Sequence, residues 1–248
     1  MCYTRRVSEA DAVDSGYPHY RVVMAASPES ATVLGCFLGD GGHPPLHIHD
    51  HDLFFIVLAG RATLRLGHGT HEGRAGQLIY IPAGLPHGSD NDSGAPERHL
   101  EIQVPGVSPG APILRPVTSV DDVPMPSTAP YVSSVSGPAT ETIGRERRWA
   151  LTNESTDQRI ARVTAVERSG PEPPGAAMSR DNDRLIVVTE GRLGTEIAAR
   201  SAVVPAEAVI VIPAGVPHLI HNPAATPARY LDADIVATTA YAKLDPGG

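Results

Sequence analysis

An internal repeat is the feature that most constrains the fold of this 248-residue chain. Segments of the first half recur in the second half at a constant shift of 131 residues, and no gap is needed between them. The matches are Ile81–Gly84 with Ile212–Gly215, Pro86-His87 with Pro217-His218, Gly60 with Gly191, Asn91 with Asn222, Arg98 with Arg229 and Leu100 with Leu231. The chain is long enough for two small domains. The repeat therefore predicts two copies of one structural unit.

Short apolar segments separated by turn residues run through the first copy. They are typical of β-strands, and the continuous apolar run at 53–59 is typical of a buried strand. The expected strands are 20–26, 31–38, 53–59, 62–66, 77–81 and 98–104. The chain contains 24 glycines and 24 prolines, which favour many turns, and no segment has helical periodicity. We expect an all-β sandwich or barrel.

Three histidines of the first copy are placed to meet at one point. His47 and His49 lie two residues apart on an extended segment, so their side chains point to the same side. His87 follows a Pro-x-Gly turn, after which a returning strand can face the pair. Neutral imidazoles are common ligands of divalent transition metals. We predict a metal site formed by His47, His49 and His87.

These residues resemble the two sequence motifs of the cupin family. The motifs are G-x5-H-x-H-x(3,4)-E-x6-G, represented by Gly42, His47, His49 and Gly60, and G-x5-P-x-G-x2-H-x3-N, represented by Gly76, Pro82, Gly84, His87 and Asn91. The resemblance implies two tandem cupin barrels of the double-stranded β-helix or jelly-roll type, a bicupin. It also implies a metal-binding glutamate, but the corresponding position is Leu53.

The composition suggests how the copies are joined. From Pro105 the chain becomes rich in proline, serine, threonine and valine, which is typical of a linker. We expect a metal-binding cupin at 1–105, a linker at 106–143 and a degenerate cupin at 144–248.

The second copy lacks most of the metal-binding pattern. His47, His49 and Leu53 correspond to Met178, Arg180 and Arg184, and only the equivalent of His87 persists, as His218. An arginine side chain does not deprotonate to become a ligand. We expect no metal in this copy and a structural role for it. Ion pairing or surface exposure is the first expectation for the two arginines, and anion binding is the alternative.

His51 is a candidate catalytic residue. It continues the spacing of His47 and His49, so it can be a fourth ligand or a general base, and the alternative is a solvated turn residue. Its equivalent is Asn182, so it is lost together with the other histidines. The adjacent Asp50 and Asp52 persist in the second copy, which indicates turn formers.

Glu101 and Gln103 share one face of the last strand of the first copy. Leu100 and Ile102 lie on the opposite face. We expect the two polar side chains to be solvated, with the lining of a cavity as the alternative. The remaining histidines, including His99, show no pattern that indicates a partner.

Three functions follow from the resemblance. The first is a metal-dependent, quercetinase-like oxygenase of a small aromatic or enol-bearing substrate. Three-histidine cupins in the acetylacetone dioxygenase and cysteine dioxygenase branches also use iron and dioxygen. The second is an oxygen-independent cyclase, isomerase or lyase of a polyketide-like or keto-acid substrate. The third is a non-catalytic binding bicupin. The sequence leaves the metal open among iron, nickel, manganese, cobalt, copper and zinc.

Charge and composition narrow the partners and the location. The net charge is −8 without a basic patch, which argues against nucleic acid. No apolar run is long enough for a membrane helix, and residues 1–12 lack the pattern of a secretory signal, so we expect a cytoplasmic location. The two cysteines form no disulfide framework. The near absence of lysine fits a bacterial source, and the resemblance implies a homodimer.

Overall fold

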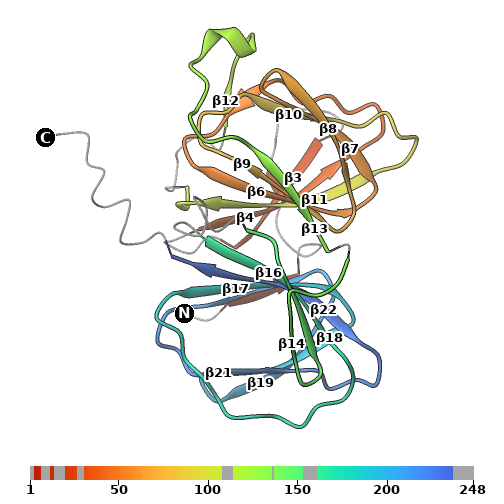
Figure 1. The fold of residues 1–248 in the computed structure, drawn as a ribbon, viewed down its shortest axis with the longest axis vertical. Helices are drawn as coiled ribbons and strands as arrows, with labels where there is room; N and C mark the ends of the chain where they lie inside the picture. Colours follow the sequence, from red (N-terminus) through yellow and green to blue (C-terminus); the bar gives the residue numbers. More distant parts are fainter. Residues whose placement is uncertain are drawn as a thin grey trace, which may run out of the picture. The chain divides into compact units, whose positions relative to one another are not determined.

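The computed structural model describes residues 3–6, 12–13, 20–26, 31–107, 114–135, 137–152 and 161–236 (Figure 1). Its elements are almost all antiparallel strands, and the described residues contain one short 3-10 helix, η2 (Val120–Asp122). The chain divides into two compact units. The first unit comprises residues 11–134, and the second comprises residues 1–10 and 135–248. The predicted all-β class is confirmed.

The first unit consists of two sheets. The larger has the strand order β13-β9-β6-β11-β4-β3-β2, and the smaller has the order β12-β5-β10-β7-β8. The strands of the larger sheet are β2 (Ala12–Val13), β3 (Tyr20–Ala26), β4 (Thr32–Leu38), β6 (Asp52–Ala59), β9 (Gln77–Ile81), β11 (Glu97–Val104) and β13 (Tyr131–Ser134). Those of the smaller sheet are β5 (His47–Ile48), β7 (Arg61–Leu66), β8 (Gly69–Arg74), β10 (His87–Asp90) and β12 (Arg115–Pro116).

The core of the first unit comes from alternate residues of β6. Leu53, Phe55 and Val57 share one face of this strand because side chains alternate. They pack against Leu64, Ile79, Ile81 and Leu85 from β7, from β9 and from the turn before β10. Leu53 is fully buried in this cluster. The position where the family motif has a glutamate therefore belongs to the apolar core.

The second unit has the same construction. Its sheets have the orders β1-β20-β17-β22-β16-β15-β14 and β19-β18-β21. The larger sheet contains β1 (Tyr3–Arg6), β14 (Glu141–Ile143), β15 (Glu146–Ala150), β16 (Ala161–Arg168), β17 (Asp183–Glu190), β20 (Ala208–Ile212) and β22 (Ala228–Ile235). The smaller contains β18 (Arg192–Ile197), β19 (Arg200–Pro205) and β21 (His218–His221). Residues such as Ile186, Val188, Ile210 and Tyr230 form its core.

The repeat extends to the bounds of the strands. Strands β6, β7, β8, β9, β10 and β11, shifted by 131 residues, coincide with β17, β18, β19, β20, β21 and β22. The corner between the first two strands of each set is also shared. Gly60 and Gly191 have φ of +76° and +74°, and an added Cβ would lie 2.7 Å from a backbone oxygen of Pro96 or Pro227. Glycine is needed there in both copies.

The units differ in two places from the division expected at 1–105, 106–143 and 144–248. Strand β1 pairs with β20 of the second unit, with Tyr3 opposite Val211. Within the expected linker, β12 pairs with β5 and β13 pairs with β9, so both extend sheets of the first unit. These short strands cover edges that would otherwise present unpaired backbone groups. Segments of two to four residues are too short to show a period in the sequence.

Candidate metal centre

His47, His49 and His87 are brought together in the first unit. His47 on β5 is the direct antiparallel partner of His87 on β10, and His49 follows β5 by one residue. One nitrogen from each of the three rings lies within 4.8 Å of the others. All three residues are buried. The antiparallel pairing thus unites side chains that lie 40 residues apart (87 − 47) in the chain.

Backbone carbonyl groups orient two of the rings. His47 Nδ1 donates to Pro45 O at 2.9 Å, and His87 Nδ1 donates to Leu85 O at 2.8 Å. A carbonyl only accepts hydrogen bonds, so Nδ1 carries the proton and Nε2 keeps its lone pair. His87 Nε2 is buried and has no hydrogen-bond partner among the described residues. This donor set fits a divalent transition metal.

The environment keeps the imidazoles in the form that binds metal. Burial lowers the pKa of His47 to about 4, and the neighbouring His49 adds to this effect. Burial also lowers the pKa of His87 well below its usual value. At neutral pH both rings are therefore uncharged, as metal ligands must be.

Glu101 supplies a carboxylate beside the histidines. It lies on β11 opposite Phe55, and only 5% of its surface is exposed. Glu101 lines a small cavity of about 10 Å³ together with His47 and His87. Burial favours the neutral acid, but a hydrogen bond with His99 and the nearby histidines lower the pKa of Glu101 to about 2. The expectation that Glu101 is solvated is wrong, because this face of β11 points into the barrel.

A buried network holds Glu101. His99 Nδ1 donates to Glu97 Oε2 at 2.8 Å, and His99 Nε2 lies 3.6 Å from Glu101 Oε1. The ring also stacks on Phe55, with the centroids 3.9 Å apart. Burial opposes a charged ring, but Glu97 and the hydrogen bonds outweigh it and raise the pKa of His99 well above its usual value. His99 therefore has partners that the sequence did not reveal.

The same network brings a further set of potential ligands together. Cys36 lies near His99 and Glu101, and the three ligand atoms are within 4.8 Å of one another. A protonated imidazole has no lone pair for a metal. We therefore interpret these three residues as part of the hydrogen-bonded support of Glu101.

The alternation of polar residues along β11 is the sequence pattern that could have indicated the buried network around Glu101. Glu97, His99, Glu101 and Gln103 occupy one face, and all four are buried. On a strand whose other face carries buried Leu100 and Ile102, four polar residues in alternation can indicate a polar interior. The sequence alone does not distinguish a polar interior from a solvated face, because this depends on which side of the sheet packs into the barrel.

His51 lies beside the three histidines. Its ring centroid is 4.9 Å from that of His49, and the residue is buried. Its Nε2 has no hydrogen-bond partner among the described residues. Burial lowers the pKa of His51 to about 4. The alternative of a solvated turn residue is wrong, whereas a role as ligand or base stays a prediction.

The neighbouring aspartates have different environments. Asp52 Oδ1 accepts a hydrogen bond from Ala83 N at 2.8 Å, and Asp183 Oδ1 accepts one from Ala214 N at 2.9 Å. Each fixes the turn that precedes the histidine of β10 or β21. The side chain of Asp50 is exposed beside Arg115. The pair at 52 and 183 explains why this aspartate persists in the copy without the three histidines.

The second unit retains the backbone of the site without its ligands. Met178 and His218 pair as His47 and His87 do, and His218 Nδ1 donates to Val216 O at 2.8 Å. Arg184 donates to both carboxylate oxygens of Asp232, at 2.8 Å each. No group of three potential ligands is found in the described part of this unit. His218 therefore lacks the two imidazoles that accompany His87 in the first unit, because Met178 and Arg180 occupy the positions of His47 and His49. The position of Leu53 is occupied by Arg184.

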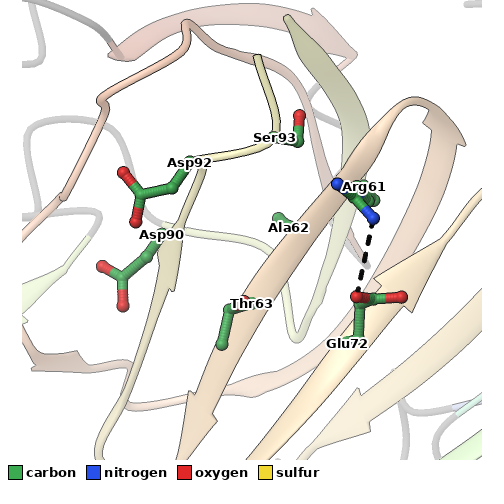
Figure 2. A pocket seen from close by; sticks show the side chains of 7 residues that line it. All are labelled: Arg61, Ala62, Thr63, Glu72, Asp90, Asp92 and Ser93. Atoms are coloured by element: carbon green, nitrogen blue, oxygen red, sulfur yellow. Dashed lines mark ion pairs between the residues drawn. The ribbon is translucent and has the colours of Figure 1, made fainter. Parts of the chain in front are cut away.

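A second hollow of the first unit lies away from the histidines. Its volume is about 160 Å³, and Figure 2 shows its lining side chains, with Arg61 and Glu72 joined by an ion pair of 4.0 Å. Asp90 lines it and lies three residues after His87 on β10. Because strand side chains alternate, Asp90 points to the face opposite His87. This hollow is therefore distinct from the candidate metal centre.

The chain has the fold of two tandem cupin-type barrels, and three histidines converge in the first. Residues 36–102 match the family model described as "Cupin domain". A search of curated proteins gives no match. None of the helices in the described ranges has the length and hydropathy needed to cross a membrane.

Solved structures share the fold over nearly the whole chain. A glyoxylate-induced protein from Pseudomonas aeruginosa is 19% identical with a TM-score of 0.70, covering 95% of this chain and 88% of its own. Vicilin from Corylus avellana is 14% identical with a TM-score of 0.69, covering 96% and 86%. Oxalate decarboxylase from Bacillus subtilis, which contains Mn(II) centres, is 15% identical with a TM-score of 0.68, covering 94% and 76%. The bicupin architecture is thereby confirmed.

Proposed function

We propose that His47, His49 and His87 hold one divalent transition metal ion and that the protein is a metal-dependent enzyme of a small substrate. The observation that carries this proposal is the convergence of three buried imidazole nitrogens. The Mn(II) centres of the similar oxalate decarboxylase support a divalent ion and leave its identity open. A bound ion with open coordination positions would supply Lewis acidity and, if redox-active, dioxygen chemistry.

An oxygenase of a small enol-bearing anion is the reaction that we favour. Three neutral imidazoles leave the charge of the ion uncompensated by its ligands, which suits an anionic substrate. Glu101 contributes one negative charge beside the centre without occupying the position of Leu53. The cavity of about 10 Å³ has room for a water-sized group. A space of this size does not discriminate between substrates, so both the enol-bearing substrate and the quercetinase-like specificity rest on the resemblance alone.

Two residues beside the centre have distinct proposed roles. Glu101 is ionised at neutral pH and can accept a hydrogen bond from a substrate hydroxyl. His51 is neutral and its buried Nε2 has no hydrogen-bond partner among the described residues, so this ring can accept a proton from the substrate. Burial of Phe55 and Leu64 around the cavity limits the access of water.

His51 also favours a second candidate, an oxygen-independent isomerase, cyclase or lyase of a keto acid. Such a reaction needs a proton acceptor near a polarised carbonyl and needs no oxidant. Product mass distinguishes the two candidates, because incorporation of oxygen raises the mass and isomerisation leaves it unchanged. Equal product from aerobic and anaerobic incubations would contradict the oxygenase.

Elemental analysis of the purified protein tests the metal site. We expect about one transition metal ion per chain, with loss in His47→Ala and retention in His218→Ala. Absence of metal from the unmodified protein after reconstitution would contradict the enzyme proposal and favour the non-catalytic bicupin. Loss with His218→Ala alone would place the ion in the second unit.

A further inference from the structure

The second unit contains a cavity of about 520 Å³ at the position that the three histidines occupy in the first. Arg180, Arg184 and His218 line it, and they are the equivalents of His49, Leu53 and His87. Its volume lies within the usual range for small-molecule sites, about 300 to 1,000 Å³. His49 and Leu53 thus correspond to two guanidiniums, which donate hydrogen bonds to anions, and the space that they border is much larger than the cavity of the first unit.

The charges around Arg184 are unequal. Arg184 is 5% exposed and binds Asp232 through Nε and one terminal nitrogen. Arg180, whose side chain is 28% exposed, donates to the same carboxylate at 3.1 Å. Two guanidiniums thus share one carboxylate. These three side chains together leave a net charge of +1 at the wall of the cavity.

The wider lining of the cavity also carries more positive than negative charge. Three further arginines border the cavity: Arg145, Arg148 and Arg168. Arg148 pairs with Glu141 and Glu146, and Arg168 pairs with Glu146 and Glu172. Arg145 donates only to the backbone oxygens of Gly170 and Pro171 within the described ranges. Five guanidiniums therefore face four carboxylates (141, 146, 172 and 232).

His218 requires a hydrogen-bond donor from a bound molecule. It is 1% exposed, and its Nε2 has no hydrogen-bond partner in the described part of the chain. Its Nδ1 donates to Val216 O, so the neutral ring presents Nε2 as an acceptor. Burial lowers the pKa of His218, and the charges of Arg184 and Arg180 lower it further. A buried acceptor without a donor is costly, so a ligand that donates to Nε2 would be favoured.

We propose that this cavity binds a small organic carboxylate that also carries a hydroxyl or amino donor. The carboxylate would bind the guanidiniums of Arg180 and Arg184, which share the single carboxylate of Asp232, since guanidinium and carboxylate match in shape and charge. The hydroxyl or amino group would donate to His218 Nε2. A metal ion is disfavoured, because the lining places its two imidazoles, His218 and His221, among five arginines, and no group of three potential ligands is found in the described part of this unit. This inference does not depend on the function of the first unit.

Calorimetric titration of the full-length protein with two pairs of acids tests the proposal. Lactate is compared with propanoate, and malate with succinate, because each pair differs by one hydroxyl. We expect the hydroxy acids to bind about ten- to a hundredfold more tightly, since the analogues leave a buried acceptor unsatisfied. Failure of all four acids to bind at millimolar concentration would overturn the proposal, as would equal affinity within both pairs.

Matched variants locate the site. His218→Gln should abolish the preference for the hydroxy acid, and Arg180→Gln should weaken both acids about tenfold or more. Arg200→Gln, at an exposed arginine outside the cavity, should leave binding unchanged. Circular dichroism confirms folding of each variant, and Arg180→Gln remains decisive if His218→Gln is unfolded. His87→Gln, the same change in the first unit, reports on the proposed metal centre, and loss of binding in this variant with retention in Arg180→Gln would place the site there and contradict the proposal.

A competition experiment tests the chemical class. Inorganic phosphate should compete with lactate only weakly, because its hydroxyl and its anionic oxygens share one phosphorus atom, whereas lactate carries its hydroxyl on the carbon next to the carboxylate. Phosphate binding as tight as that of lactate in the unmodified protein would indicate a general oxyanion site and overturn the assigned ligand class.

Discussion

Residue 101 and its equivalent, residue 232, are both inward-facing acids, although their neighbours have changed. Glu101 faces three imidazoles, and Asp232 faces two guanidiniums. Each acid lies on the last strand of its unit and has a depressed pKa because positive groups donate to it. Each unit thus has a buried carboxylate on its last strand, whereas position 53, where the family motif has a glutamate, carries leucine.

We expect Glu101→Gln to lower metal affinity about ten- to a hundredfold, the usual effect of losing a charged group next to the ligands. Glutamine keeps the shape of the side chain, so the loss reports on charge. Competition with a chromogenic chelator measures the affinity. The matched control is Glu72→Gln in the exposed hollow of Figure 2. Unchanged affinity in Glu101→Gln would show that Glu101 does not interact with the metal.

The lowered pKa of His51 predicts that stability depends on pH. The ring has a pKa of about 4 in the folded protein and 6.5 as its ordinary value. Between these values the unfolded chain binds more protons, so the free energy of unfolding falls as pH falls from 6.5 towards 4. The full effect is on the order of 3 kcal/mol, at about 1.4 kcal/mol per pKa unit.

Chemical denaturation of the metal-free protein at pH 7 and pH 5 measures this effect. We expect His51→Asn, which introduces the residue of the second copy, to lose less stability over this interval than the unmodified protein. Glu101 contributes to the loss of stability only at lower pH, between 4.5 and about 2, because its pKa is lowered to about 2 in the folded protein. An equal loss in both proteins would contradict a neutral, buried His51.

The strand-to-strand corner at Gly60 is preserved in both units. It connects β6 to β7, and its counterpart at Gly191 connects β17 to β18. Both have positive φ and both lie against the backbone of the residue before β11 or β22. The corner therefore fixes the position of the strand that carries Glu101 or Asp232.

We expect Gly60→Ala to destabilise the protein by about 2 to 4 kcal/mol, through positive φ and the clash with Pro96 O. Gly94→Ala is the matched control. Gly94 also has a positive φ, of +79°, but nothing lies within 4 Å of its added Cβ, so about 1 kcal/mol is expected. Denaturant titration measures both. Equal losses would show that the close approach at Gly60 is unimportant.

The molecule as a whole is not a simple succession of two halves. Strand β1 begins the chain but completes a sheet of the second unit, where it pairs with β20 along Tyr3–Arg6. The core of that unit is built from residues after 135. The first ten residues therefore belong to a unit whose remaining sequence begins more than a hundred residues later.

Deletion of residues 1–10 tests this arrangement. We expect the melting temperature to fall by about 5 °C and aggregation to increase, because the edge of β20 loses its partner. Metal content should stay unchanged, since the proposed ligands lie within 11–134. A chain lacking only residues 1–2 retains β1 and serves as control. Loss of metal with an unchanged melting temperature would contradict the pairing.

The sequence by itself determined the repeat, the all-β class and the convergence of His47, His49 and His87. These depend on local information, because alternation along a strand and glycine at a turn are properties of a few neighbouring residues. Loss of the histidine set from the second copy was equally readable, since the shift of 131 residues aligns every position.

Only the tertiary structure decided which strands and side chains complete each site. Glu101 lies 46 residues (101 − 55) beyond Phe55, which it faces, and the register of β11 on β6 determines that it points inward. The burial of His51 and the pairing of β1 with β20 likewise depend on contacts between distant segments. Alternation reveals that two faces differ, but the packing of the sheet determines which face is inside.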